Sequence, residues 1–192
     1  MKKLPLVALG LLLLSISVSA QTRIADRTEW REFNFLEGGI KVTFPGEPSR
    51  STAEREQPAG KITFTELHLS FPQITFMLSW SDFPRAAAAD DHVLHAGYDT
   101  VRDQVLTGMS AKLIGENDIR TDGFLGRELI FKTATQFVKY RVFFVGRREY
   151  QLITSRYADL ENDPDISNEV DKFLDSFHFI SQTADNKQKK PQ

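Results

Sequence analysis

The sequence predicts an α+β domain in which a central antiparallel sheet is flanked by two main helices. Three observations lead to this fold class. Apolar and polar residues alternate in many short runs, which is the period of a half-buried strand. The loops between these runs have hairpin length, so neighbouring strands must be antiparallel. Two longer stretches repeat apolar residues at the period of a helix that buries one face.

The first half of the chain reads as strands. Glycines at 38 and 39 supply a turn between the first two, and Pro45 and Pro48 then end the ladder because proline has no N–H to donate. The run over 52–56 has no apolar face and is expected at a sheet edge. The run over 74–81 is strongly apolar and is expected near the centre of the sheet. The expected strands cover 30–35, 40–44, 52–56, 61–70 and 74–81.

The first expected helix spans residues 90–107. Asp90 or Asp91 can cap the free amides of its first turn, and Gly108 stands at a natural stop position. Its buried stripe is expected to contain Val93, Gly97, Val101 and Val105.

The second half of the chain repeats the pattern of strands followed by a helix. Asp163 is expected to cap a second helix that has Pro164 at its first position and an apolar stripe through Phe173. A single domain is expected over 21–182, and the polar segment 183–192 is expected to be disordered. The remaining strands are expected at 112–119, 128–134, 137–145, 149–154 and 178–180.

Residues 1–20 have the layout of a secretory signal peptide. Lys2 and Lys3 precede an apolar run over 6–18, and small residues at 18 and 20 fit a cut between Ala20 and Gln21. The alternative is an uncut anchor, but the run is shorter than the ~20 residues that span a bilayer. The chain is therefore expected to be exported, to the periplasm or the exterior, with no stable membrane insertion after cleavage.

Charge and cysteine content exclude several classes of function. Removal of Lys2 and Lys3 changes the formal net charge from −2 to −4. This negative charge argues against nucleic acid as a partner, because binding to phosphates needs a basic face. The sequence has no cysteine. This excludes a disulfide framework, a thiol nucleophile, a Cys-ligated metal and a lipidated cysteine anchor. The core must therefore come from apolar side chains, among them 15 phenylalanines.

One pair of histidines is the main candidate for metal chemistry. His92 and His95 lie three residues apart on the first helix, with Asp91 beside them, and two imidazoles at that spacing can share a divalent metal. The sequence nominates no third ligand, so two solvated histidines are the favoured interpretation and no metal or other cofactor is expected. The Gly-x-Ser-x-Gly and Ser-x-x-Lys motifs of serine nucleophiles are absent, and no catalytic residue is expected.

A second candidate is a basic patch at a hairpin tip. Arg147 and Arg148 lie in the expected turn, near Lys139 and Arg141 on the preceding strand. Such a patch could meet an acidic partner or an anionic surface, although a solvated hairpin tip is the favoured interpretation.

Several short motifs carry a resemblance to a known fold. They are Trp30-x-x-Phe33, Glu37-Gly38-Gly39-Ile40-x-Val42-x-Phe44-Pro45-Gly46-x-Pro48, Gly123-x-x-Gly126-Arg127-Glu128, Tyr150-Gln151-Leu152 and Phe173-Leu174-x-Ser176-Phe177. With the order of elements, they resemble the PsbP-like α/β/α sandwich, the fold of an extrinsic protein of the oxygen-evolving photosystem and of a nuclear-transport factor that binds a small GTPase. They are also similar to exported bacterial proteins of unknown function. The resemblance implies a domain that binds proteins and does no chemistry.

The leading functional expectation is an exported non-enzymatic domain that binds another protein of the cell envelope or assists an envelope complex. A small-ligand carrier, with its pocket between the sheet and a helix, is the alternative. A hydrolase with a dispersed site is the third possibility. A pocket of several hundred Å³ with converging polar groups favours the carrier or the enzyme, and an exposed apolar patch favours the protein-binding domain.

Overall fold

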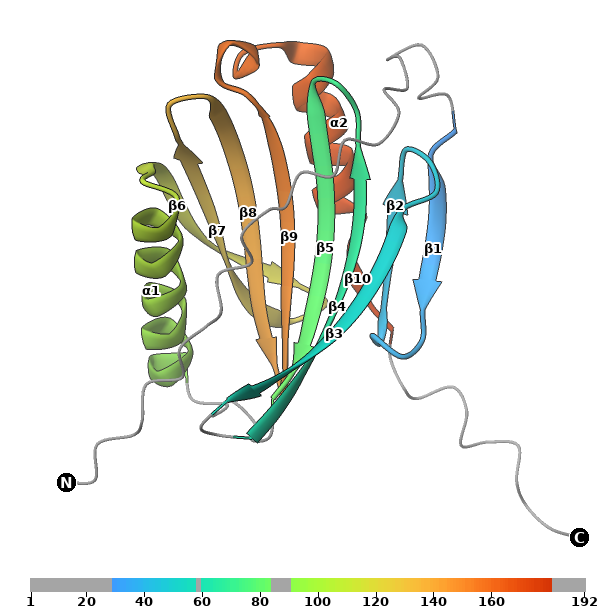
Figure 1. Ribbon diagram of the computed structural model, residues 1–192, viewed down its shortest axis with the longest axis vertical. Helices are drawn as coiled ribbons and strands as arrows, with labels where there is room; N and C mark the ends of the chain where they lie inside the picture. Colours follow the sequence, from blue (N-terminus) through green and yellow to red (C-terminus); the bar gives the residue numbers. More distant parts are fainter. Residues whose placement is uncertain (1–28, 58–59, 84–90, 181–192) are drawn as a thin grey trace, which may run out of the picture.

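The computed structural model describes residues 29–57, 60–83 and 91–180 (Figure 1). Within those ranges the chain forms two antiparallel sheets and two α-helices. No helix of the described ranges is both long enough and apolar enough to span a membrane. The expected signal segment, its cut between Ala20 and Gln21, and the polar segment 183–192 all lie outside the described residues.

The larger sheet has seven strands, and each neighbouring pair in it is antiparallel. The charged strand β3 lies at one edge, as its lack of an apolar face predicts, and the apolar strand β5 lies in the interior. Strand β6 forms the other edge. In spatial order the strands are β3 (Ser49–Gln57), β4 (Gly60–Ser70), β5 (Ile74–Asp82), β9 (Arg148–Tyr157), β8 (Gln136–Val145), β7 (Phe124–Lys132) and β6 (Lys112–Thr121).

A second, three-stranded sheet corrects the expectation of one central sheet. It pairs β2 (Ile40–Phe44) with β1 (Arg31–Phe35) on one side and with β10 (His178–Phe179) on the other. The turn with Pro45 and Pro48 interrupts the ladder after β2, so the first hairpin does not continue into the larger sheet. The backbone N–H of Thr43 instead donates to Ser176 Oγ over 2.9 Å, which places β2 beside the end of the second helix.

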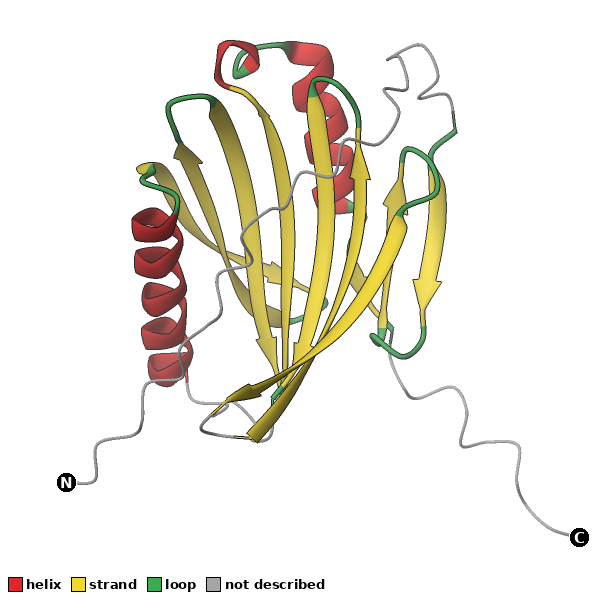
Figure 2. Cartoon of the chain, viewed as in Figure 1, coloured by secondary structure: helices red, strands yellow, loops and turns green. Residues whose placement is uncertain are grey.

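The two helices lie on opposite faces of the larger sheet (Figure 1). Helix α1 (Asp91–Gly108) packs on β7 and β8. Helix α2 (Pro164–Asp175) shares the other face with the small sheet. The expected α/β/α sandwich is therefore right in its antiparallel strands and two helices, but the strands form two sheets, a more β-rich arrangement than one central sheet flanked by helices (Figure 2).

Both helices begin and pack largely as their sequences predict. The Asp163 side chain caps α2 by accepting from the backbone N–H groups of Asp165 and Ile166, both at 3.0 Å. In α1, Val101 and Val105 are buried, but Val93 in the first turn is exposed, contrary to the expected stripe. A short 3₁₀-helix at Ala158–Leu160 connects β9 to α2.

The core on the α2 face contains most of the aromatic residues. Phe76 on β5 is fully buried, as its alternation with Ile74 and Leu78 predicts. Its ring meets the Phe173 ring of α2 edge-on, with centroids 5.3 Å apart. This packing fixes α2 against the middle of the sheet.

The β6–β7 hairpin is longer than the sequence predicts. Asp122 and Gly123 both have positive φ angles, 50° and 88°, and form a two-residue turn, so β7 begins at residue 124 and not at 128. At Gly126 a Cβ atom would overlap the Phe143 ring, so glycine is required where β8 packs this closely. Figure 1 shows the hairpin passing behind β8 and β9 toward β10.

Candidate functional site

A cluster of charged side chains lies between α1 and the β6–β7 hairpin, and Arg127 of β7 is its centre. The Arg127 side chain is only 9% exposed. Its Nε donates to Asp118 Oδ1 over 2.7 Å, and its Nη1 contacts Glu116 and lies 3.3 Å from Asp99 Oδ1. We call this group the Arg127 cluster; its members are His95, Asp99, Arg102, Glu116, Asp118 and Arg127.

His95, a predicted site residue, belongs to this cluster. Arg127 Nη2 lies 2.8 Å from His95 Nδ1. A guanidinium has no acceptor, so the arginine must be the donor and Nδ1 must carry a lone pair. The imidazole is therefore assigned as the neutral tautomer with its proton on Nε2.

The cluster connects the helix to the hairpin. Arg102 of α1 lies 3.0 Å from Asp99 and 3.3 Å from Glu116 of β6. Tyr98 Oη donates to the carbonyl of Leu125 over 2.8 Å, and the Arg127 guanidinium lies over the Tyr98 ring at 5.5 Å. Burial raises the pKa of Tyr98 to about 12, so this phenol remains a donor. These contacts join β6 and β7 to α1.

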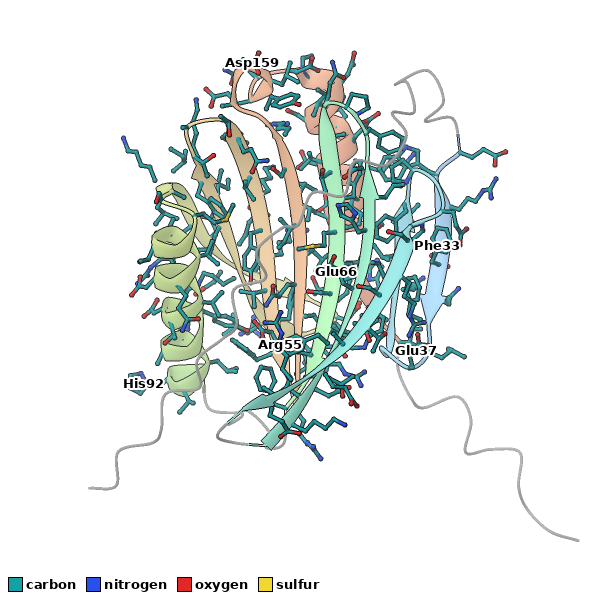
Figure 3. The ribbon with its side chains drawn as sticks, viewed as in Figure 1. Phe33, Glu37, Arg55, Glu66, His92 and Asp159 are labelled. Atoms are coloured by element: carbon teal, nitrogen blue, oxygen red, sulfur yellow. The ribbon has the colours of Figure 1, made fainter. Side chains whose placement is uncertain are left out.

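The two histidines of the candidate metal site have different surroundings. His92 is exposed at the N-terminal end of α1 (Figure 3), whereas His95 binds Arg127. The Asp91 side chain lies outside what the structure describes. No group of three or more potential ligands in the described ranges could hold a metal ion. A metal on His95 Nε2 would also require the proton to move to Nδ1, where Arg127 donates.

Two cavities border β6, one on each face of the larger sheet. The α1-side cavity has a volume of about 390 Å³ and is lined by His95, Asp118, Ile119, Arg120 and Leu125. The α2-side cavity has a volume of about 400 Å³ and is lined by Ile119, Arg120, Thr121, Asp122, Arg141, Leu174, Asp175, Phe177 and His178. Ile119 and Arg120 line both cavities.

Most charges around the α2-side cavity are paired. Arg141 binds Glu128 at 2.7 Å and Asp175 at 2.9 Å. The Asp122 carboxylate accepts from the backbone N–H of Phe179 at 2.8 Å and lies 3.2 Å from His178 Nδ1. The hairpin tip is thereby fixed to β10.

Arg120 is the exception among these charges. Its Nη1 donates to the carbonyl of Gly123 over 3.1 Å. Within the described ranges no carboxylate lies within salt-bridge distance of its guanidinium. The Arg120 side chain therefore places a positive charge where the two cavities meet.

Exposed apolar side chains lie at both ends of this edge. Ile114 is 53% exposed where a bulge interrupts the register between Leu113 and Gly115. Phe124, just after the turn, is 41% exposed and packs its ring 4.8 Å from that of Phe179. In the described sheet β6 pairs with β7 alone, so its outer edge carries unpaired backbone groups.

The expected basic patch does not exist as a free patch. Arg148 binds Asp82 at 2.6 Å, Lys139 binds Asp171 at 2.8 Å, and Arg141 is paired as described above. Arg147 donates to the carbonyl of Phe83 over 2.8 Å. Cross-strand and helix carboxylates, which are distant in sequence, pair with Lys139, Arg141 and Arg148.

A buried carboxyl group on β9 was not predicted. Glu149 is fully buried; its Oε1 accepts from Gln151 Nε2 over 2.8 Å, and its Oε2 has no hydrogen-bond partner among the described residues. Burial raises the pKa of Glu149 to about 7, against the smaller opposing effect of the Gln151 hydrogen bond. Only one feature of the sequence indicates that Glu149 is buried. Strand alternation places this acidic residue on the face of the sheet that α1 covers.

Sequence reasoning also missed Arg127, although a signal was present. An Asp-Gly pair favours a two-residue hairpin turn. With the turn at Asp122 and Gly123, Asp118 and Arg127 become directly opposed, as the structure shows. The strand expected at 128–134 begins after Arg127, so that expectation did not include the pairing of Asp118 with Arg127.

Comparisons with solved structures identify the fold. The solution structure of cyanobacterial PsbP from Synechocystis sp. PCC 6803 matches with a TM-score of 0.51 at 14% identity, over 85% of this chain and 98% of that one. The chain therefore has a PsbP-like fold, as its motifs suggested. No family model matches the sequence, and a search of curated proteins finds no match.

Two further solved structures are similar at lower scores. A Pseudomonas aeruginosa protein of unknown function matches with a TM-score of 0.40 and 13% identity, over 74% of this chain and 94% of that one. The Saccharomyces cerevisiae Ran-binding protein Mog1p matches with a TM-score of 0.44 and 10% identity, over 79% of this chain and 96% of that one.

Proposed function

We propose that this chain is a non-enzymatic domain that binds another protein. One observation carries the proposal: both arginines of the Arg127 cluster are paired with carboxylates, while the β6 edge beside the cluster stays unpaired in the described sheet. Arg127 and Arg102 engage Asp99, Glu116 and Asp118. Ile114, Arg120 and Phe124 remain exposed along the edge. An exposed surface that combines aromatic, aliphatic and arginine side chains is typical of a protein interface.

The arrangement of potential catalytic groups supports a binding role. His95 is held by Arg127 through Nδ1 and has no nucleophile among its described hydrogen-bond partners. His68 Nε2 lies 3.1 Å from Ser70 Oγ on β4, the one close Ser–His hydrogen bond in the described ranges. Ser70 is exposed, and neither residue lines the two cavities.

A small-ligand carrier is the second candidate, and one observation favours it. The α1-side cavity of about 390 Å³ lies between the sheet and α1, as that hypothesis expects. Its volume is within the range of small-molecule sites, about 300–1,000 Å³, but it is open to solvent and its lining is mainly polar. The carrier hypothesis and the protein-binding hypothesis differ in what saturates the site. A purified small molecule would saturate a carrier, and a protein would not.

Export is part of the proposal. The basic start, short apolar run and small residues before Gln21 support cleavage after Ala20. N-terminal sequencing of the protein recovered from outside the cytoplasm should begin at Gln21. Recovery of a membrane-bound chain that still begins at Met1 would contradict it.

The proposed function is tested by capture followed by reconstitution. The mature chain, residues 21–192, is used to capture proteins from an envelope extract, and each candidate is then purified and mixed with it. We expect one protein to form a complex at defined stoichiometry in sedimentation analysis, in the absence of any small molecule. If no purified protein re-forms a complex while a small molecule saturates the chain, the carrier hypothesis replaces ours.

A further inference from the structure

The unpaired edge of β6 has a cavity on each side of it. The α1-side cavity includes His95 of α1, and the α2-side cavity includes Leu174 of α2. These helices lie on opposite faces of the sheet, so the cavities do too. Ile119 and Arg120 of β6 line both cavities, which therefore meet at one short part of the edge.

An extended peptide fits this arrangement because its side chains alternate between the two faces of a sheet. Neighbouring residues of an added strand would direct one side chain into each cavity, while the backbone pairs with β6. We infer that an extended segment of the partner protein adds to β6 as an eighth strand of the larger sheet. Main-chain hydrogen bonds then supply affinity and the two cavities supply specificity. This inference rests on the proposed function.

Charge complementarity identifies one side chain of that segment. Arg120 is the cation at the meeting point of the cavities and has no carboxylate partner in the described ranges, whereas Arg141 is neutralised by Glu128 and Asp175. A guanidinium binds a carboxylate through paired hydrogen bonds. The segment therefore carries an Asp or Glu whose carboxylate reaches Arg120.

The opposite edge of the sheet lacks these features. Strand β3 carries alternating charges, including Arg50 paired with Glu37 and Glu54 paired with Lys61. Neither cavity is lined by a β3 residue.

Two local features define where the added strand would pair. The bulge between Leu113 and Gly115 breaks the regular ladder, so pairing is expected from Gly115 to Thr121. The Arg127 cluster holds this part of β6 through Glu116 and Asp118. A preorganised edge loses little conformational entropy when a peptide binds.

The test uses peptides selected for binding to the mature chain. A library of random ten-residue peptides is displayed on phage, and the enriched sequences are synthesised and titrated by fluorescence anisotropy. We expect enriched peptides to contain an acidic residue, and Arg120→Glu to weaken their binding by about tenfold or more. A peptide with that acidic residue changed to Lys should recover affinity for Arg120→Glu.

The matched control is Arg55→Glu on the opposite edge strand. Arg55 lies on β3 (Figure 3), and its guanidinium contacts the Phe64 ring at 5.4 Å. This variant makes the same change of charge and should bind the peptides within about twofold of the wild type, because bulk charge is screened by salt. Equal losses in both variants would overturn the assignment of Arg120.

Two backbone measurements separate strand addition from other binding modes. Amide exchange should slow by about tenfold or more in the complex at every second position of 115–121, where the N–H points away from β7 and becomes newly paired. N-methylation of alternate peptide residues should abolish binding in one register and preserve it in the other, because only one edge of the peptide faces β6.

The outcomes distinguish this inference from the proposed function. Absence of enriched peptides, or a bound peptide that protects amides elsewhere, would overturn strand addition at β6. A reconstituted protein complex with unprotected β6 amides would overturn it as well while leaving the proposed function standing. Failure of every reconstitution would overturn the proposed function.

Discussion

Arg127 Nη2 donates a hydrogen bond to His95 Nδ1 over 2.8 Å, and so joins β7 to the first turns of α1. The direction of this bond fixes the imidazole tautomer, since the guanidinium can only donate. It also gives the histidine a structural role. The candidate metal ligand suggested by the sequence is thus part of an ion cluster that fixes β6 in place.

The purified protein should contain no stoichiometric zinc. Metal ligation through His95 Nε2 would require a proton on Nδ1, where Arg127 donates, and His92 lies exposed in the first turn. Elemental analysis of protein purified without a polyhistidine tag checks this prediction. Near-equimolar zinc that disappears in a His92→Ala, His95→Ala double variant would overturn it.

Arg127→Ala should lower the free energy of unfolding by about 3 kcal/mol, because it leaves Glu116 and Asp118 without their buried cation. Urea denaturation measures this loss. The matched control is Arg102→Ala, whose side chain is 25% exposed; it should lose less than about 1 kcal/mol. Equal losses in the two variants would show that Arg127 is not the centre of the cluster.

Phe76→Ala should lower the free energy of unfolding by about 3–5 kcal/mol, the usual range for a buried phenylalanine. Phe76 is fully buried and packs against Phe173. Phe124→Ala serves as the control, since that ring is 41% exposed, and it should lose distinctly less stability. A loss below about 1 kcal/mol for Phe76→Ala would contradict the described core.

Glu149 should make stability fall as the pH rises. Burial raises the pKa of Glu149 in the folded chain to about 7 from an ordinary value of 4.5. Between these values the unfolded chain loses the proton while the folded chain keeps it. The stability contribution is therefore fully present below pH 4.5 and is lost by pH 7, a difference of about 3 kcal/mol.

Urea denaturation at a series of pH values compares the wild type with Glu149→Gln, which should remove this slope. Glu66→Gln is the matched control, because Glu66 is half-buried on the same face of the sheet (Figure 3). A slope that persists in Glu149→Gln, or that disappears in Glu66→Gln, would contradict the assignment.

The sequence predicted the strands well because their alternation is local. The expected strand at 40–44 agrees with β2, Ile40–Phe44. Alternation shows that one face of a strand is buried, but it does not say which strand lies beside it. The pairing of β2 with β10 depends on contacts such as Thr43 with Ser176, 133 positions apart. The second sheet could not be derived from periodicity for that reason.

The site was less predictable because its residues come from three elements. His95 on α1 is 32 positions from Arg127, and no local pattern connects them. The pairing of Asp118 with Arg127 was accessible through the Asp-Gly turn, which fixes the register of the hairpin. The cavities, in contrast, depend on how the hairpin curves toward α2 and β10, which packing decides.

Amide hydrogen exchange of the mature chain with its reconstituted protein partner tests the central claim most directly. The account predicts slowed exchange in β6 between Gly115 and Thr121 and little change in the opposite edge strand β3. Arg120→Glu should reduce that protection, and Arg55→Glu should preserve it. A stable complex with unchanged exchange along β6, or with protection confined to β3 or to the three-stranded sheet, would contradict the account.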